Sequence, residues 1–347
     1  MRLGIIGQPG AGKPAIFEAL TGIAIAPGDK NEDHMGTIQV PDERVDHLSR
    51  LYRPRKTTYA QVEYFLPGFA KHVDAGRKEI DTPGGWTRIR NCDALIHVLR
   101  NFTLYGMDDP APGSDFSAME EEMILADLLV VEKRLERLEK DQKRGKKPNP
   151  EEYDLLSRCQ DALEGETPLR KKPELASSPL LKGFALLSSK PVLVLLNNPD
   201  DDPEMPELPE QIAPETCISI RGQLERELSQ MDKEEAALFF EEYQIENTAA
   251  DRVIRYSYAI LGLISFFTVG EDEVKAWTIK KDTLAVDAAG AIHSDMKKGF
   301  IRAEVLAYND LKEAGSYKEA RKKGTVRLEG KTYCVQDGDI INFRFNV

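Results

Sequence analysis

The residues best suited to chemistry stand near the start of the chain, in a short glycine-rich stretch. Its seven residues are Gly7, Gln8, Pro9, Gly10, Ala11, Gly12 and Lys13. They match the Walker A pattern, in which glycines let backbone N–H groups close around phosphates and the lysine reaches the β- and γ-phosphates. An apolar, strand-like run at 3–6 precedes the stretch, and a helical pattern follows it through residue 20. This order of strand, loop and helix predicts a nucleotide-binding site.

The residue that follows this loop departs from the pattern. A Walker A loop continues with Ser or Thr, whose hydroxyl binds Mg²⁺, but this chain has Pro14. Proline also removes one backbone N–H from the phosphate site, although it fits the first turn of a helix. We therefore expect a nucleotide to bind weakly, with Mg²⁺ deprived of its first protein ligand.

The elements that would position this loop can be read from the apolar pattern. Three further apolar runs, at 62–66, 94–99 and 191–196, are typical of buried strands with helical segments between them. They predict a mostly parallel sheet of the α/β class.

A long insertion separates the last two of these runs. Its apolar residues recur at heptad spacing and are Ile124, Leu128, Val131, Leu135 and Leu138. This seam, followed by a second apolar helix pattern at 155–163, predicts an antiparallel helical hairpin. The turn between the two helices carries the cations Lys143, Arg144, Lys146 and Lys147. Such a tip is either an RNA-binding surface or a solvated turn.

The end of the chain changes to short alternating segments. Strands are predicted at 274–279, 300–305, 325–328, 331–335 and 340–345, with a helix at 308–313. Five strands and a short helix in fewer than 80 residues indicate a small β-grasp domain.

Composition excludes several classes of protein. The 347 residues include 59 acidic and 47 basic side chains and have a net charge of −12, which argues against wholesale coating of nucleic acid. The longest apolar stretch, at 259–267, is too short to span a bilayer, so no membrane association is expected. Four scattered cysteines form neither a zinc spacing nor a disulfide framework, which predicts a reducing, cytoplasmic location.

Several longer motifs resemble those of the YchF-type, Obg-like ATPases. They are VPDER at 40–44, CDALIHV at 92–98, KPVL at 190–193, AWTI at 276–279, GAIHSD at 290–295, KGFIRAE at 298–304 and VQDGDIINFRFNV at 335–347. The resemblance implies a P-loop G domain with an inserted coiled-coil hairpin and a C-terminal TGS domain of β-grasp fold. The expected boundaries are 1–115 and 187–268 for the G domain, 116–186 for the hairpin and 269–347 for the TGS domain.

The resemblance fails at the two switch regions, which hold magnesium in this family. The family's switch II is Asp-x-x-Gly followed by a hydrophobic residue; here Phe69 keeps the hydrophobic position, but Phe65 replaces the Asp. A second Asp-x-x-Gly begins at Asp81, which would serve as a substitute ligand if it swung toward the phosphates. At the switch I threonine position the chain has Lys30. Because phosphoryl transfer depends on metal and positioned charge, we expect hydrolysis to be weakened.

The base-binding motif is also altered. GTPases use Asn-Lys-x-Asp, and the resemblance implies a Glu in place of the Asp and a preference for adenine. Here the motif runs from Asn197 to Asp200 without the Lys, so it does not choose between ATP and GTP. Ser219 stands where the family's second base-contacting loop lies.

Three hypotheses follow for the function. The first is a nucleotide-binding protein that associates with ribosomes or RNA and hydrolyses its nucleotide poorly. The second is a slow ATPase or GTPase with a non-standard switch, and the third is a pseudo-GTPase scaffold with an empty phosphate loop. Besides the hairpin tip, Lys297, Lys298 and Arg302 of the C-terminal domain are candidates for RNA or ribosome contact. The sequence leaves the oligomeric state open.

Overall fold

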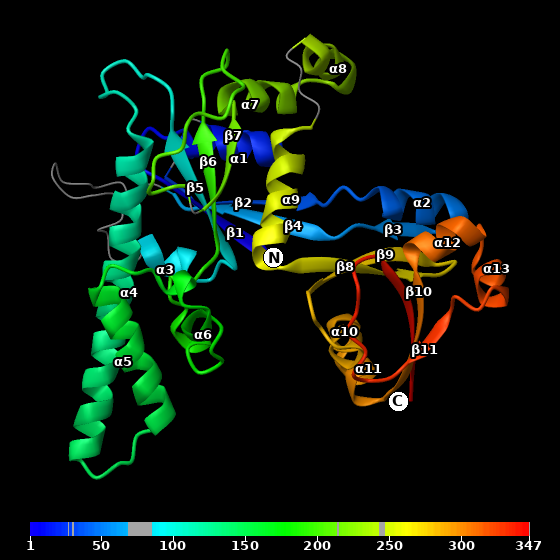
Figure 1. Cartoon of the computed structure of the whole chain (residues 1–347). Helices are drawn as coiled ribbons and strands as arrows, with labels where there is room; N and C mark the ends of the chain where they lie inside the picture. The colour runs from blue at the N-terminus through cyan, green and yellow to red at the C-terminus, as the bar shows by residue number, and fades with distance from the viewer. Residues whose placement is uncertain (27, 30, 69–84, 214, 243–246, 347) are drawn as a thin grey trace. The chain divides into compact units, whose positions relative to one another are not determined.

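The computed structural model describes residues 1–26, 28, 29, 31–68, 85–213, 215–242 and 247–346. The chain forms two compact units (Figure 1). The first contains Met1–Thr37 and Glu63–Tyr256, and the second contains Ile38–Val62 and Ser257–Val347. Residues 38–62, which the expected boundaries assign to the G domain, thus group with the C-terminal residues.

A six-stranded sheet forms the centre of the first unit. Its order is β2 (His34–Gln39), β4 (Gln61–Leu66), β1 (Arg2–Ile6), β5 (Ala94–Arg100), β6 (Val192–Asn197) and β7 (Thr216–Ile220). The strands from β4 to β7 pair in parallel. Strands β5 and β6 are buried along their whole length, as expected for the centre of a sheet covered on both faces. The predicted parallel sheet is confirmed, whereas β7 was not predicted.

The helices of this part of the chain are α1 (Lys13–Thr21), α3 (Gly85–Ile89), α4 (Pro112–Lys143), α5 (Pro150–Glu164), α6 (Pro173–Ala176), α7 (Gly222–Gln230), α8 (Lys233–Glu242) and α9 (Ala249–Leu261). Short 3₁₀ turns occur at Leu169–Lys171 and Lys182–Phe184. Figure 1 shows α4 and α5 running side by side as a hairpin. Val131, Leu135 and Leu138 of the predicted seam pack in one apolar cluster with Leu156 and Cys159 of α5.

One buried carboxylate fastens the long helix to the sheet. Asp127 of α4 is fully buried and accepts hydrogen bonds from the backbone N–H groups of Leu187 and Ser188, which precede β6. Arg90, just after α3, donates to the same carboxylate at 2.8 Å. A buried charge satisfied on several sides fixes one relative position of its elements. The hairpin is therefore anchored to the unit that carries the phosphate loop.

The second unit is built on another six-stranded sheet. Its order is β11 (Arg327–Glu329), β10 (Phe300–Ala307), β12 (Asp339–Phe345), β8 (Leu263–Val269), β9 (Glu273–Lys280) and β3 (Lys56–Thr58). Its helices are α2 (Glu43–Tyr52), α10 (Ala285–Ile292), α11 (Ser294–Lys298), α12 (Tyr308–Ala314) and α13 (Tyr317–Lys322). Two apolar clusters, one containing Phe266 and Val305 and the other Phe267 and Leu306, fill its interior.

Two features of the C-terminal strands differ from the sequence-based expectation. β8 pairs with β9 and β12, so residues 263–269 belong to this second sheet, although the expected boundary of the C-terminal domain lies at 269. In place of a strand at 331–335, the structure has a single antiparallel bridge between Leu284 and Cys334 at the start of α10. Ala285 N–H donates to Tyr333 O at 2.7 Å, and Val335 N–H donates to Thr283 O at 3.0 Å. Across the described part of the chain, no helix is long and apolar enough to cross a membrane.

Candidate nucleotide-binding site

The phosphate loop connects β1 to α1, and its glycines are required by its geometry. Gly7, Gly10 and Gly12 all have positive φ angles, of 147°, 81° and 90°. A Cβ atom on Gly7 would lie 2.3 Å from the carbonyl oxygen of Val98, and one on Gly12 would lie 2.3 Å from Asn197 Nδ2. Such conformations and approaches are open only to glycine. The loop therefore has the shape that the sequence pattern predicts.

Lys13 lies at the junction of this loop and α1. Its side chain is buried, and its Nζ donates to the carbonyl oxygens of Gly7 at 2.7 Å and Gln8 at 3.1 Å. Helix α1 starts at Lys13 with Pro14 in its first turn. The positive end of the helix dipole and the ammonium group thus meet at the loop, which favours an anion there.

Asn197 joins the phosphate loop to the base-binding motif. It lies at the carboxyl end of β6 and is 3% exposed. Its Nδ2 donates to Ala11 O at 3.0 Å, and its Oδ1 accepts from the backbone N–H of Gly222 at 3.0 Å. One side chain therefore holds the loop and the first residue of α7 together.

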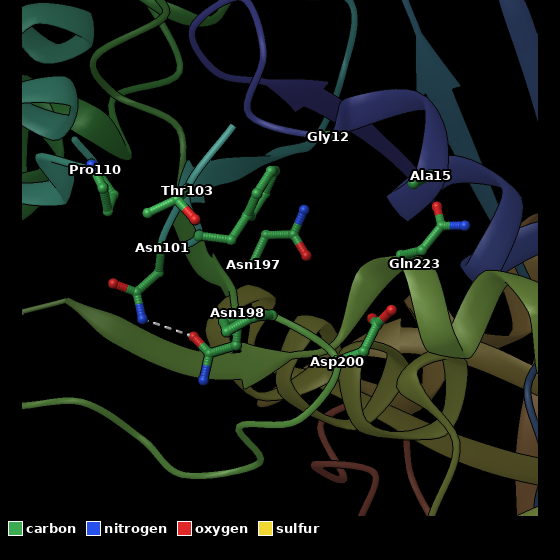
Figure 2. A pocket seen from close by; sticks show the side chains of 11 residues that line it. Gly12, Ala15, Asn101, Thr103, Pro110, Asn197, Asn198, Asp200 and Gln223 are labelled. Atoms are coloured by element: carbon green, nitrogen blue, oxygen red, sulfur yellow. Dashed lines mark hydrogen bonds between the residues drawn. The ribbon is translucent and has the colours of Figure 1, made fainter. Parts of the chain in front are cut away.

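The next residues of the motif continue this network. Asn198 Oδ1 accepts from Asn101 Nδ2 at 2.9 Å, as the dashed line in Figure 2 shows. Asp200 Oδ1 accepts from the backbone N–H of Leu224 at 3.0 Å, in the first turn of α7. Because the N-cap residue Arg221 provides no side-chain cap, Asn197 and Asp200 supply acceptors for that helix end instead.

A cavity of about 540 Å³ lies between these elements (Figure 2). Of the residues predicted from the sequence, Gly12, Asn197 and Asp200 line it. Ser219 is not among its lining residues, and the Ser219 carbonyl accepts from Arg252 Nη1 at 2.8 Å. The volume suits a small-molecule ligand.

Sequence reasoning missed most of the cavity wall. The segment after β5 contributes Asn101, Phe102, Thr103 and Pro110 to the lining of the cavity, and α7 contributes Gln223. The signal that would have indicated them is positional, because ligands of open α/β sheets bind beyond the carboxyl ends of the strands. Residues 101–110 directly follow such a strand end.

A buried histidine lies behind the phosphate loop. His97 of β5 pairs in register with Ile6, the residue before the loop, and stacks on Phe116 with ring centroids 5.4 Å apart. Full burial, together with the positive charges of Arg170 and Lys13, lowers the pKa of His97 to about 3. The imidazole is therefore neutral at physiological pH.

Comparison with known proteins identifies the family to which the whole chain belongs. A family model for the C-terminal part of YchF GTPases, described as a protein of unknown function, matches residues 263–346. The chain is 37% identical over 369 residues to the ribosome-binding ATPase YchF of Bacillus subtilis, and the match covers 99% of each chain. The chain belongs to the YchF family of Obg-like ATPases.

Two further matches agree. Obg-like ATPase 1 of Oryza sativa subsp. japonica is 36% identical over 367 residues, covering all of this chain and 92% of the relative. The structure of the Schizosaccharomyces pombe YchF GTPase matches 99% of this chain and 97% of its own, with a TM-score of 0.81 at 29% identity. The predicted family and the predicted fold, a P-loop G domain joined to a C-terminal domain, are confirmed.

The magnesium positions of this YchF-family chain provide no oxygen ligand where the structure describes them. Pro14 has no hydroxyl, and Phe65 is buried in β4. Lys30, Phe69 and Asp81 lie outside the described residues. Within the described ranges, no group of three His, Cys, Asp or Glu side chains could hold a metal ion. Within the part of the chain that the structure describes, the side chains at these positions do not fit a protein-held Mg²⁺.

A carboxylate beside the switch II glycine is already engaged. Asp33 Oδ1 accepts from the backbone N–H of Gly68 at 2.9 Å and also pairs with Arg88 of α3. The guanidinium of Arg88 balances the charge of this carboxylate, and the amide of Gly68 occupies one of its oxygens. Asp33 therefore connects the segment before β2 to both sides of switch II.

The two groups of RNA candidates differ in their surroundings. At the hairpin tip, Lys143, Arg144, Lys146 and Lys147 are all exposed, and Lys146 pairs with Asp141 at 3.2 Å. In the second unit, Lys297 pairs with Asp287 at 2.7 Å and Lys298 approaches Asp295 at 3.7 Å, whereas Arg302 is exposed on β10. The hairpin tip thus carries the denser positive charge.

Proposed function

We propose that this YchF-family protein binds an adenine nucleotide, ATP in particular, in the cavity between the phosphate loop and residues 197–200. The observation that carries the proposal is the position of Asn197, which bonds to both the loop and the start of α7. A polyphosphate at the loop would place its base in the adjoining cavity, beside Asp200 and Asn101. The relatives' names as ATPases support the same ligand.

The state of Asp200 supports adenine over guanine. Guanine presents two neighbouring donors, N1–H and N2–H, which are matched by both oxygens of a carboxylate, whereas adenine presents one amino group. Asp200 Oδ1 already accepts from the backbone of Leu224, which leaves Oδ2 for a base. Asn101, whose Nδ2 is bonded to Asn198, can offer its Oδ1 as a second acceptor. These two acceptors suit the two N–H bonds of adenine's single amino group.

We further propose that the nucleotide acts mainly as a bound ligand and is hydrolysed slowly. Pro14 and Phe65 replace two residues that would otherwise bring oxygen atoms to Mg²⁺. Without protein-held metal, the transition state for phosphoryl transfer lacks its main source of charge stabilisation. Mg²⁺ would then reach the site only on the phosphates of the nucleotide.

The proposed partner is the ribosome, in the cytoplasm. The matched bacterial relatives are named ribosome-binding ATPases. The exposed tip of the hairpin offers four cations within five residues, and clustered Lys and Arg side chains bind RNA phosphates. Arg302 is a second, weaker candidate contact.

Equilibrium titration with ATP and GTP tests the nucleotide proposal. We expect saturable binding that favours ATP and that is lost in Lys13→Met, which keeps the length of the side chain but removes its charge. Asp200→Asn adds a second test, because a carboxylate that reads guanine would gain xanthosine triphosphate binding on this change. We expect no such gain. Preference for GTP, or a gain for xanthosine triphosphate, would contradict the adenine assignment.

The remaining hypotheses correspond to other results of the same titration. Absence of binding for either nucleotide would indicate a scaffold with an empty loop. Turnover that requires Mg²⁺ and disappears in Lys13→Met would indicate a slow ATPase with ligands outside the described residues.

A further inference from the structure

The segment between β5 and α4 contacts both ends of the candidate site. Asn101, Phe102, Thr103 and Pro110 line the cavity. Farther along the same segment, Met107 covers the phosphate loop, since a Cβ atom on Gly10 would lie 2.7 Å from its sulfur. Leu104 lies beside it, with its Cδ2 at 4.0 Å from the same position. One stretch of irregular chain thus borders the base cavity and the phosphate loop together.

A single buried side chain gives this segment its shape. Arg100, the last residue of β5, is 6% exposed. Its Nη1 donates to Phe102 O at 3.1 Å and its Nη2 donates to Asp108 O at 2.7 Å. The two carbonyls stand near opposite ends of the segment, so the rigid fork of the guanidinium closes it into a loop.

The other described bonds between this loop and the sheet lie at its start, where the Asn101 N–H donates to Asn197 O at 2.9 Å and Asn101 Nδ2 donates to Asn198 Oδ1 at 2.9 Å. Leu104 and Met107 are each 44% exposed, and Tyr105 is fully exposed. The loop has one internal turn, closed by the Met107 N–H to Leu104 O bond at 3.0 Å. Within the described ranges Arg100 forms no ion pair, so neutral carbonyls satisfy its charge. A buried charge is costly unless it is hydrogen-bonded, and here the carbonyls of the loop, together with the nearby negative charge of Asp115, compensate that of Arg100.

We propose that Arg100 is a positioning residue for nucleotide binding, which shapes residues 101–110 into the wall of the base cavity and the cover of Gly10. The inference rests on the proposed function, because it assumes that the cavity holds the nucleotide. A cavity wall that is ordered before binding strengthens binding, because no further conformational entropy of the loop is lost when the ligand binds. Without Arg100 the loop must be ordered by the nucleotide itself.

ATP titration of Arg100→Met, Arg100→Lys and a control variant tests this proposal. We expect Arg100→Met to weaken ATP binding by about tenfold or more. Lysine should not restore it, because one ammonium does not span both carbonyls. The matched control is Arg90→Met, which removes a buried guanidinium that bonds to Ala126 O, Ala185 O and Asp127 but does not line the cavity. The control should lower the melting temperature and keep the wild-type affinity for ATP.

Hydrogen exchange separates positioning from a general loss of stability. In the wild-type protein, we expect the same exchange protection at 101–110 with and without ATP. In Arg100→Met, protection there should appear only when ATP is added. Equal ATP affinity in wild type and Arg100→Met would overturn the proposal. Failure of the wild type to bind ATP would instead overturn the proposed function and this inference with it.

A surface variant keeps the proposal testable if Arg100→Met does not fold. Leu104→Ala/Met107→Ala alters two half-exposed side chains and removes the cover over Gly10. We expect ATP affinity to fall about threefold to tenfold. Affinity that rises would show that the loop blocks the phosphate site, and it would contradict the proposal.

Discussion

The base end and the phosphate end of the candidate site are built in different ways. At the base end, the side chains of Asn197, Asn198 and Asp200 each hold a neighbouring segment by hydrogen bonds. At the phosphate end, the glycine loop keeps its shape through its backbone, whereas Pro14 and Phe65 leave no oxygen for a metal. Under the proposed function, the parts expected to hold a nucleotide are present, whereas two described positions expected to hold its metal, Pro14 and Phe65, carry no oxygen in their side chains.

Under the proposed function, this difference means that binding and hydrolysis depend on separable parts of the fold. Phosphate binding by a glycine loop depends on backbone N–H groups, which survive most side-chain changes. Metal binding depends on single side-chain oxygens, each of which one substitution removes. A chain of this family can therefore lose the metal contacts while the sheet, loop and base motif stay in place.

The largest expected effect comes from breaking the base end at Asn197. Asn197→Ala leaves the Ala11 carbonyl and the Gly222 N–H without their partner, and each unpaired buried group costs about 1–3 kcal/mol. We expect about a hundredfold loss of ATP affinity with a clear fall in melting temperature, measured by calorimetric titration and thermal unfolding. The matched control is Asn198→Ala, whose partners lie outside the phosphate loop and which should have a smaller effect. Equal effects of both substitutions would contradict the bridging role of Asn197.

The pH dependence of folding stability tests the surroundings of His97, which lies behind the phosphate loop. Its pKa in the folded protein is lowered to about 3, so between about pH 6.5 and 3 the unfolded chain binds a proton that the folded chain does not. The free energy of unfolding should therefore fall as the pH drops through this window, by up to about 1.4 kcal/mol per pH unit. Above the window, His97 should make no pH-dependent contribution to it.

His97→Phe should remove this contribution. Urea unfolding of both proteins at several pH values between 7 and 4 measures it. We expect the variant to gain stability relative to wild type as the solution becomes more acidic. Two parallel profiles would show that His97 is not held neutral by its surroundings.

The hairpin tip tests whether the ribosome contact is independent of the nucleotide site. Lys146→Glu/Lys147→Glu should weaken ribosome binding about tenfold and reduce its dependence on salt, because fewer cations meet RNA phosphates. Co-sedimentation with ribosomes at two salt concentrations measures this. Lys133→Glu/Arg137→Glu makes the same charge change on exposed positions of α4 away from the tip and should have little effect. A tip variant that binds ribosomes as wild type does would exclude the tip as the contact.

The smallest expected effect comes from restoring one metal ligand. Pro14→Ser returns a hydroxyl to the first turn of α1, and we expect Mg²⁺ to strengthen its ATP binding about threefold to tenfold. Pro14→Ala is the control, because it restores only the backbone N–H and should improve affinity without a response to Mg²⁺. If both variants respond equally to Mg²⁺, the hydroxyl is not the missing ligand.

The sequence predicted the parts of the fold whose signal is local. The glycine loop, the apolar strands β1, β4, β5 and β6, and the heptad seam of α4 all have patterns set by neighbours along the chain. Asn197 was predicted because its motif follows a buried strand. The grouping of β3 and α2 with the C-terminal sheet was not predicted, because pairing of β3 with β9 depends on residues more than 200 positions apart.

The wall of the cavity was missed for a related reason. Residues 101–110 have no periodicity, and their shape depends on Arg100, which reads in sequence only as the end of an apolar strand. Ser219 was predicted by its motif position but does not line the cavity, where Gln223 of the next helix does. Whether Ser219 or Gln223 lines the cavity depends on the residue at which α7 begins. This was not predicted, because helix boundaries are weakly encoded in single sequences.

The most direct test of the account is the wild-type affinity for ATP with Mg²⁺ and with a chelator, measured by calorimetric titration alongside an assay for released phosphate. If the base end and the loop hold the nucleotide without protein-held metal, the two dissociation constants should agree and little phosphate should appear. An affinity that requires Mg²⁺, together with Mg²⁺-dependent release of phosphate, would contradict metal-independent binding and direct attention to Asp81 as the metal contact.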